Sequence, residues 1–325
     1  MPAPTLLFGG ASIGDSFKTV QALETLLTQL KDLGITRIDT AARYPATNQG
    51  ESERLLGEVG AVAKGFAVDT KINTGPGFGP TFPGSLTAEA IDKSLQQSYQ
   101  SLAISGKGTE VVNVLYCHAP DSETPLEQQA AALDALFKKG MFKQLGLSNY
   151  PPEMVEKFVQ ICDKEGYVKP AVYQGKYNLV ARGAEDALLP LLRQHDIAFI
   201  AYSPLAGGFL SGNFTAGNTE GTRFQEGTLI GDFIRPHFDK PELHAAIKAL
   251  DSLLESHGIS KPEAALRWAC FHSALKAENG DGIILGASRA EQVVANVEAV
   301  KKGPLPEEVV KGMEGIWFEV KKGGA

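Results

Sequence analysis

Cysteine is scarce in this sequence, and the few cysteines present are placed where they can form no framework. Of the 325 residues three are cysteines, Cys117, Cys162 and Cys270. Their number is odd, they lie far apart, and no C-x-x-C pair occurs, which argues against a disulfide scaffold, a zinc site or a redox dithiol. We therefore expect three small buried side chains, a reducing compartment and no metal site.

Basic clusters and long apolar runs are also missing. The chain has 31 Lys and Arg against 38 Asp and Glu, a formal net charge of −7, and its densest basic clusters are pairs such as Lys138-Lys139. Nucleic acids and anionic membranes attract clustered cations, so neither is an expected partner. No apolar run approaches the ~18 residues of a membrane span, and no positive residue precedes Lys18. We expect no signal peptide and a cytoplasmic location.

Apolar residues, by contrast, are plentiful. They make up 43% of the chain, enough for a sizeable core and too many for a disordered one. Short apolar runs alternate with longer stretches of helical spacing. We expect a strand at 5–9, a helix at 19–33, a strand at 35–39 and a helix at 52–59 with Ser52 as its N-cap.

The same alternation runs to the C-terminus. Two stretches rich in helix breakers interrupt it, the loop at 75–80 and a Gly-rich segment at 207–235. Further strands are expected at 66–71, 111–118, 142–147, 171–177, 198–202 and 282–285, and further helices at 87–102, 125–139, 152–165, 186–195, 241–257, 262–275, 291–300 and 306–318.

Eight strands, each followed by a helix, predict a parallel sheet that closes on itself. We expect an α/β protein with a (β/α)8 TIM barrel, a single domain over residues 1–325, a long loop after the seventh strand and a C-terminal helix. An open, doubly wound sheet is the alternative. It is less favoured because the glycines within 8–14 match neither the G-x-G-x-x-G spacing of a dinucleotide fold nor a P-loop.

In such a barrel, chemistry is expected where strands reach their C-terminal ends. Asp39 ends the second expected strand, and Tyr44 follows shortly after it. Lys71 ends the third strand and His118 the fourth. Each residue alone is compatible with a structural role, such as an ion pair or a buried histidine. Titratable groups gathered at one rim indicate a functional site instead.

These four side chains suit the reduction of a carbonyl group. The ammonium of Lys71 would favour the phenolate of Tyr44 and make the phenol a better acid, and Asp39 would keep that ammonium charged. His118 would polarise the carbonyl oxygen by a hydrogen bond. No side chain supplies hydride, so a nicotinamide is required. A lyase with a Schiff base on Lys71 is an alternative, but it needs an uncharged amine, which Asp39 opposes.

Several motifs, in order along the chain, resemble the aldo-keto reductases over nearly its whole length. Two longer segments, 173–178 (YQGKYN) and 201–208 (AYSPLAGG), are similar to the branch with aflatoxin aldehyde reductases and succinic semialdehyde reductases. The motifs are IDTAxxY at 38–44, ESERLLG at 51–57, the Lys71 strand end, VLYCH at 114–118, GLSN at 146–149, YQ at 173–174 and GAS at 286–288. Cys117 departs from the usual aliphatic residue, so oxidation or simple burial are both open for it.

The resemblance implies an NADPH-dependent reduction of aldehydes, aromatic or carboxylate-bearing, with Tyr44 as the proton donor. It implies a small-molecule carbonyl substrate, and a homodimer is an accompanying expectation. The implied cofactor residues are Ser148, Asn149 and Gln174 for the nicotinamide carboxamide, Tyr202 for the ring, Ser203, Leu205 and Gly207 for the pyrophosphate, and Ser288, Gln292 and Asn296 for the adenosine end.

Charge near the adenosine end favours NADPH over NADH. Ser288 and Arg289 open an expected helix, and a helix N-terminus with a cation suits a 2′-phosphate; alternatively Ser288 only caps the helix. Arg223 and Arg235, in the segment after the seventh strand, are candidates for binding the cofactor phosphates or a substrate carboxylate, or are solvated loop residues. An NADPH-binding regulatory subunit, similar to potassium-channel β subunits and with little turnover, is the alternative function.

Overall fold

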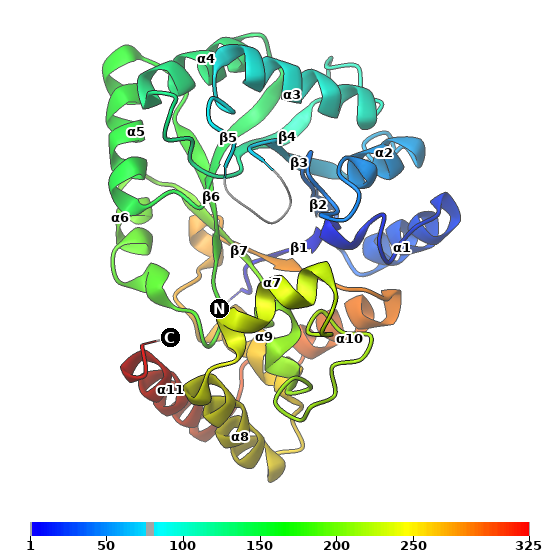
Figure 1. The fold of residues 1–325 in the computed structure, drawn as a ribbon, viewed down its shortest axis with the longest axis vertical. Helices are drawn as coiled ribbons and strands as arrows, with labels where there is room; N and C mark the ends of the chain where they lie inside the picture. Colours follow the sequence, from blue (N-terminus) through cyan, green and yellow to red (C-terminus); the bar gives the residue numbers. More distant parts are fainter. Residues whose placement is uncertain (1, 76–80, 325) are drawn as a thin grey trace.

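Every strand of this chain runs parallel to its neighbours, and the last pairs with the first. The computed structural model describes residues 2–75 and 81–324, so residues 76–80 of the breaker-rich loop lie outside it. The described residues form one closed barrel in chain order, which confirms the single-domain (β/α)8 prediction (Figure 1). The strands are β1 (Thr5–Gly9), β2 (Arg37–Asp39), β3 (Ala67–Ile72), β4 (Val112–Cys117), β5 (Phe142–Ser148), β6 (Pro170–Lys176), β7 (Ala198–Tyr202) and β8 (Gly282–Leu285).

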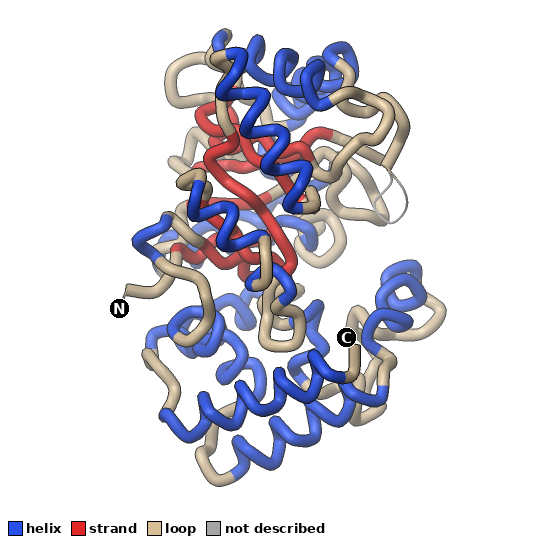
Figure 2. Tube along the Cα trace, turned by 90° about the vertical axis from the view of Figure 1, so that its left-hand side faces the viewer, coloured by secondary structure: helices blue, strands red, loops and turns tan. Residues whose placement is uncertain are grey.

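Helices cover the outside of the barrel, as Figure 2 shows. Polar caps fix where several begin; Thr19 Oγ1, for example, accepts a hydrogen bond of 3.2 Å from Ala22 N at the first helix. The helices are α1 (Val20–Asp32), α2 (Glu51–Glu58), α3 (Ala88–Ser101), α4 (Leu126–Lys138), α5 (Pro152–Glu165), α6 (Leu188–Gln194), α7 (Leu229–Phe238), α8 (Pro241–Glu255), α9 (Lys261–Phe271), α10 (Ala290–Lys301) and α11 (Glu307–Lys322), with short 3-10 turns η1 (Gly10–Ser12), η2 (Gly183–Glu185), η3 (Ala206–Ser211) and η4 (Ala277–Asn279).

Two sequence expectations were wrong in detail. The segment at 207–235 is not all irregular, because most of η3 and most of α7 lie in it. The helix α7 was not expected because it contains Pro236, a residue that disfavours helix interiors. Ser52 does not cap α2, which begins at Glu51 after Gly50. The Ser52 hydroxyl instead donates to Gly10 O at 2.9 Å and so ties α2 to the end of β1.

The interior of the barrel is apolar on one side and charged on the other. A small buried cluster of apolar side chains fills the part near β1, β4, β6, β7 and β8, whereas β2 and β3 contribute buried charged residues. A much larger apolar layer lies between the strands and the surrounding helices. The inner cluster consists of Leu7, Val114, Tyr116, Val172, Ile200 and Ile284. The charges on β2 and β3 therefore require partners of their own.

One buried carboxylate closes the N-terminal end of the barrel. Asp281, just before β8, accepts a bidentate pair from Arg193 at 3.0 and 2.6 Å. It also accepts hydrogen bonds from Phe199 N at 2.8 Å and Lys276 N at 2.7 Å. Its backbone oxygen accepts from Thr5 N at 3.0 Å. A single residue thus links α6, β7, β8 and β1, the last through its backbone oxygen.

The C-terminal helix α11 lies beside α8 at one end of the molecule (Figure 1). Arg182, after β6, donates to Glu314 of α11 at 2.7 Å. Its guanidinium lies 4.9 Å from the Trp268 ring and 5.5 Å from the Trp317 ring. Cation–π contact and a charged hydrogen bond therefore join α11 to the barrel. None of the helices in the described ranges is both long enough and apolar enough to cross a membrane.

Candidate active site

The four residues predicted to carry the chemistry meet at the C-terminal mouth of the barrel, and we call Asp39, Tyr44, Lys71 and His118 the tetrad. Lys71 Nζ lies 2.7 Å from Asp39 Oδ1 and donates to Thr40 O, also at 2.7 Å. The same nitrogen is 4.9 Å from the centre of the Tyr44 ring. The rings of Tyr44 and His118 lie edge to face, with centroids 5.7 Å apart. Loops and strand ends separated by about eighty residues thus bring an acid, a base and two rings into contact range.

The charge states of this group follow from burial and from its neighbours. Burial alone would lower the pKa of Lys71, but Asp39, Tyr44 and Asp69 together outweigh it, so the pKa of Lys71 is raised and the amine stays charged. Burial, with the charges of Lys71 and Arg43, holds the pKa of His118 well below its usual range, so the imidazole is neutral. A charged Lys71 disfavours the Schiff-base lyase.

His118 is also incompletely bonded. Among the residues that the structure describes, its buried Nδ1 has no hydrogen-bond partner. Buried polar atoms in folded proteins are nearly always paired, so an orphaned one requires an explanation. A ligand or ordered water at the mouth would supply the missing partner.

The residues predicted for the nicotinamide surround the same group. Asn149 Nδ2 donates to His118 O at 2.9 Å, and Tyr202 OH donates to Asn149 Oδ1 at 2.9 Å. Ser148 Oγ accepts from Asn149 Nδ2 at 3.0 Å. Gln174 Nε2 donates to Asp39 Oδ1 at 2.7 Å. The ends of β5 and β6 are therefore bonded directly to the catalytic candidates, and the end of β7 is bonded to them through Asn149.

The turn after β7 is shaped for close approach to its backbone. Gly207 and Gly208 have φ 68° and 105°, conformations that glycine adopts without strain. Ser203 lies in the same left-handed region, with φ 55°. Within the described residues, no atom lies within 4 Å of the position a Cβ would take at Gly207 or Gly208. Leu205 precedes this turn and packs on the core. A backbone open in this way can face a phosphate.

The predicted adenosine residues gather at the start of α10. Gln292 Oε1 accepts from Ser288 N at 2.8 Å and from Arg289 N at 3.2 Å. The helix N-cap is Arg289 rather than Ser288, so the simple capping role for Ser288 was wrong. Both residues are exposed, and Asn296 follows one turn further along the helix. These four side chains share one accessible helix end.

The two arginines after the seventh strand differ in position. Arg235 donates to Phe224 O at 3.0 Å, lies 5.1 Å from the Phe214 ring and so braces its own segment. Arg223 is exposed to water, and its charge lies within electrostatic range of Tyr44 and Asp15. Arg235, by contrast, makes its contacts within its own segment.

Sequence reasoning missed Arg43 and Asp15. Burial lowers the pKa of Arg43, while the nearby Tyr44 and Tyr202 act in the opposite direction. Arg43 occupies a variable position in the IDTAxxY segment, directly before Tyr44. Its position beside the tyrosine was the available signal. No pattern connected Asp15 to the site.

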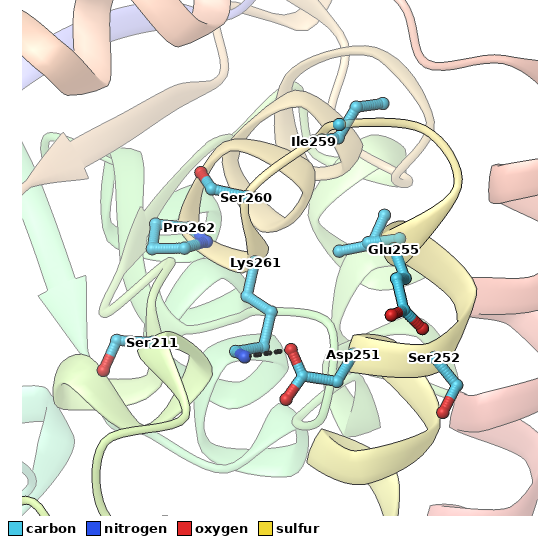
Figure 3. A pocket seen from close by; sticks show the side chains of 10 residues that line it. Ser211, Asp251, Ser252, Glu255, Ile259, Ser260, Lys261 and Pro262 are labelled. Atoms are coloured by element: carbon cyan, nitrogen blue, oxygen red, sulfur yellow. Dashed lines mark hydrogen bonds and ion pairs between the residues drawn. The ribbon is translucent and has the colours of Figure 1, made fainter.

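A hollow in the surface lies away from these residues. It has a volume of about 560 Å³ and lies between η3, α8 and α9, and Figure 3 shows Lys261 and Asp251 paired across it with Ser211 to one side. Its lining contains none of the tetrad. The three cysteines are buried as predicted, and burial raises the pKa of Cys117 to about 12, so its thiol is unreactive. In the described ranges, no His, Cys, Asp and Glu side chains gather in a group of three or more that could hold a metal ion.

Comparisons with known proteins identify the family of this chain. The model of the Aldo/keto reductase family matches residues 5–317. An aldo-keto reductase of Pseudocercospora fijiensis is 35% identical over 299 residues, 91% of this chain and 97% of that protein. Human aflatoxin B1 aldehyde reductase member 4 is 35% identical over 292 residues, 87% of this chain and 85% of that protein. The oxidoreductase sirO of Leptosphaeria maculans is 33% identical, over 98% of this chain and 95% of its own. The chain therefore belongs to the aldo/keto reductase family, oxidoreductases that reduce carbonyl groups with a nicotinamide cofactor.

Proposed function

We propose that this chain, as one reductase domain over residues 1–325, reduces aldehydes to alcohols with NADPH, and that Tyr44 donates the proton. The observation that carries the proposal is the buried Lys71–Asp39 pair, 2.7 Å apart, beneath the ring of Tyr44. A fixed ammonium at that place stabilises the phenolate that remains after proton donation. Without that pair, a phenol at neutral pH would be a poor acid.

The residues at the mouth fit a nicotinamide cofactor. Ser148, Asn149 and Gln174 would hold the carboxamide, and Tyr202 would stack on the ring. The open backbone at Gly207, with Ser203 and Leu205, would follow the pyrophosphate. The exposed end of α10, with Ser288, Arg289, Gln292 and Asn296, would bind a 2′-phosphate and so select NADPH. When bound, the reduced nicotinamide supplies hydride to the carbonyl carbon.

The protein side chains supply the remaining proton and the orientation. Tyr44 transfers its phenolic proton to the carbonyl oxygen, which completes the alcohol. Lys71 stabilises the resulting phenolate, and Asp39 holds the ammonium in place. His118, neutral at physiological pH, has one N–H with which to hold the carbonyl oxygen during the transfer. Exchange with solvent then restores the phenol.

The test is a fluorescence titration of the apoprotein with NADPH and NADH, followed by turnover of 4-nitrobenzaldehyde. We expect NADPH to bind more tightly, and Tyr44→Phe to bind it equally well but to turn over several orders of magnitude more slowly. Tight binding without turnover of any aldehyde would instead support a regulatory subunit. Absence of binding would contradict the whole proposal.

We further propose that the substrates include aldehydes carrying a carboxylate, with Arg223 as its partner. The support is that this exposed arginine lies within electrostatic range of Tyr44. Arg223→Ala should raise KM for 2-carboxybenzaldehyde about tenfold or more and leave that for benzaldehyde within about twofold, because one charged contact is lost. Arg235→Ala is the control, because Arg235 lies in the same segment and makes its contacts within that segment. The homodimer and the cytoplasmic location stay predictions.

A further inference from the structure

Two ion pairs cross between β2 and β3 in successive layers of the barrel. Along β2 the sequence places Arg37 two residues before Asp39, and along β3 it places Asp69 two residues before Lys71. Alternate residues of a strand share a face. Asp39 and Asp69 stand opposite each other in the register of the two strands. Each binds a cation of the other strand, at 2.7 Å for Lys71 Nζ–Asp39 Oδ1 and 2.8 Å for Arg37 Nε–Asp69 Oδ2.

The second pair is not part of the tetrad, yet it is almost as deeply buried. The side chain of Asp69 is 0% exposed and that of Arg37 is 19% exposed. Asn113 Nδ2, on β4, donates to the other oxygen of Asp69 at 2.7 Å. Burial raises the pKa of Asp69 to about 6, Arg37 and Asn113 oppose the rise, and the charge of Asp39 adds to it. Asp69 is therefore ionised at neutral and alkaline pH.

Two facing carboxylates inside a barrel are unfavourable unless both are paired. Here two cations and two carboxylates sum to zero charge, and Lys71 lies within range of both carboxylates. Several charged or polar groups face Asp69, namely Arg37 and Asp39 from β2, Lys71 from β3, and Asn113 and Tyr116 from β4. The groups that face Lys71 are Asp39, Tyr44, Glu53 of α2, Asp69, Tyr116 and His118.

We propose that Asp69 is a positioning residue for the reduction, which with Arg37 balances the charge of Lys71 and thereby sets how readily the Tyr44 phenol releases its proton. The inference rests on the proposed role of Tyr44 as proton donor. With Asp69 present, the two carboxylates offset the positive charges of Lys71 and Arg37. Without it, an uncompensated positive charge remains below the site and favours the phenolate.

Asp69→Asn tests this, because it removes the charge and keeps the size of the side chain. In 4-nitrobenzaldehyde reduction with NADPH, the alkaline limb of the kcat/KM profile should move down by about 0.5–1 pH unit, as one uncompensated charge would cause at an effective dielectric constant of about 20–40. In the double variant Arg37→Gln/Asp69→Asn neither charge remains. Its limb should return to within about 0.3 pH unit of the parent.

A second readout needs neither cofactor nor turnover. The tyrosinate absorbance of the apoprotein is titrated, and the same titration in a Tyr44→Phe background is subtracted, so that only the ionisation of Tyr44 remains. This ionisation should move in the same direction as the limb. If it moves while the limb stays, the charge balance stands and the proton donor has been misassigned, which is a failure of the proposed function alone.

Asp281→Asn is the matched control, because it removes a carboxylate from an equally buried pair at the other end of the barrel, with side chains 0% and 26% exposed. It should lower thermal stability and leave both titrations in place. The inference is overturned if a folded Asp69→Asn protein moves neither titration, if the control moves them as far, or if the double variant shifts like the single one. Should Asp69→Asn not fold, the double variant decides. A near-parental kcat and alkaline limb would support the proposal, and a kcat as low as that of a Lys71→Met variant, which lacks the ammonium, would overturn it.

Discussion

The two ends of the barrel both hold buried charges, but they differ in how completely these are bonded. At the N-terminal end Asp281 accepts hydrogen bonds from Arg193 and from two backbone amides, and the set is closed. At the C-terminal end Lys71 is firmly paired, yet His118 Nδ1 has no partner among the described residues. The first set has nothing left to offer a ligand, whereas the second does. Structural and functional groups of buried charges can thus be distinguished by whether a buried polar atom beside them lacks a hydrogen-bond partner.

Tyr44→Phe should show the largest contrast between an effect on kcat and an effect on stability. The hydroxyl belongs to the open site, so its loss should lower kcat by ~10²–10⁴-fold and change the free energy of unfolding by less than about 1 kcal/mol. Steady-state kinetics and denaturant unfolding on the same preparation measure both. Turnover within tenfold of the parent would remove Tyr44 from its assigned role.

Asp281→Asn should show the opposite pattern. Breaking a buried charged pair leaves Arg193 without its partner, and we expect a loss of about 3 kcal/mol in the free energy of unfolding. The kcat per folded molecule should stay within about twofold, because the carboxylate is at the far end of the strands. Urea unfolding with an activity assay on the folded fraction checks this. A fall in kcat as large as that of Tyr44→Phe would show that the two ends of the barrel are coupled, which would contradict their separate roles.

His118 should make the free energy of unfolding sensitive to acid. Its pKa is lower in the folded protein than in the unfolded chain, so its contribution to stability is present above about pH 6.5 and is lost as the pH falls below that value. The loss should reach about 1.4 kcal/mol at pH 5.5. Comparing the pH dependence of unfolding of the parent and His118→Asn isolates this contribution. Parallel curves for the two proteins would argue against a buried, neutral His118.

Arg289→Ala should have the smallest effect, since the side chain is exposed and screened by salt. We expect NADPH to bind about fivefold more weakly and NADH to be unaffected, provided that this helix end binds the 2′-phosphate. Titrations at two salt concentrations measure the change. Equal losses for both cofactors would leave the cofactor preference without its proposed cause.

Much of this architecture could be predicted from the sequence, because its apolar strands are short and their ends are polar. Asp39, Lys71 and His118 were found as interruptions at strand ends, and a barrel requires such ends to converge. The helix α7 was missed because Pro236 and several glycines outweighed its apolar pattern. Local propensity there is overridden by packing.

Other features could not be derived from the sequence. The acids and bases of β2 and β3 are spaced as exposed strand residues would be, so the pairing of Arg37 with Asp69 appears only when the register is known. Likewise, Arg223 is separated from Tyr44 and Asp15 by most of the chain, and only the fold brings it within electrostatic range of both. Long-range electrostatic contacts leave no periodicity to detect.

The contact of Arg182 with Trp268 and Trp317 has an optical consequence. These are the chain's two tryptophans, so its entire indole emission comes from the junction between the barrel and α11. Reduced nicotinamide can accept that emission by energy transfer, whereas the oxidised form cannot. A signal that changes with both forms would therefore report movement of α11, and one that changes only with the reduced form would report occupancy. The protein carries its own spectroscopic label for distinguishing the two.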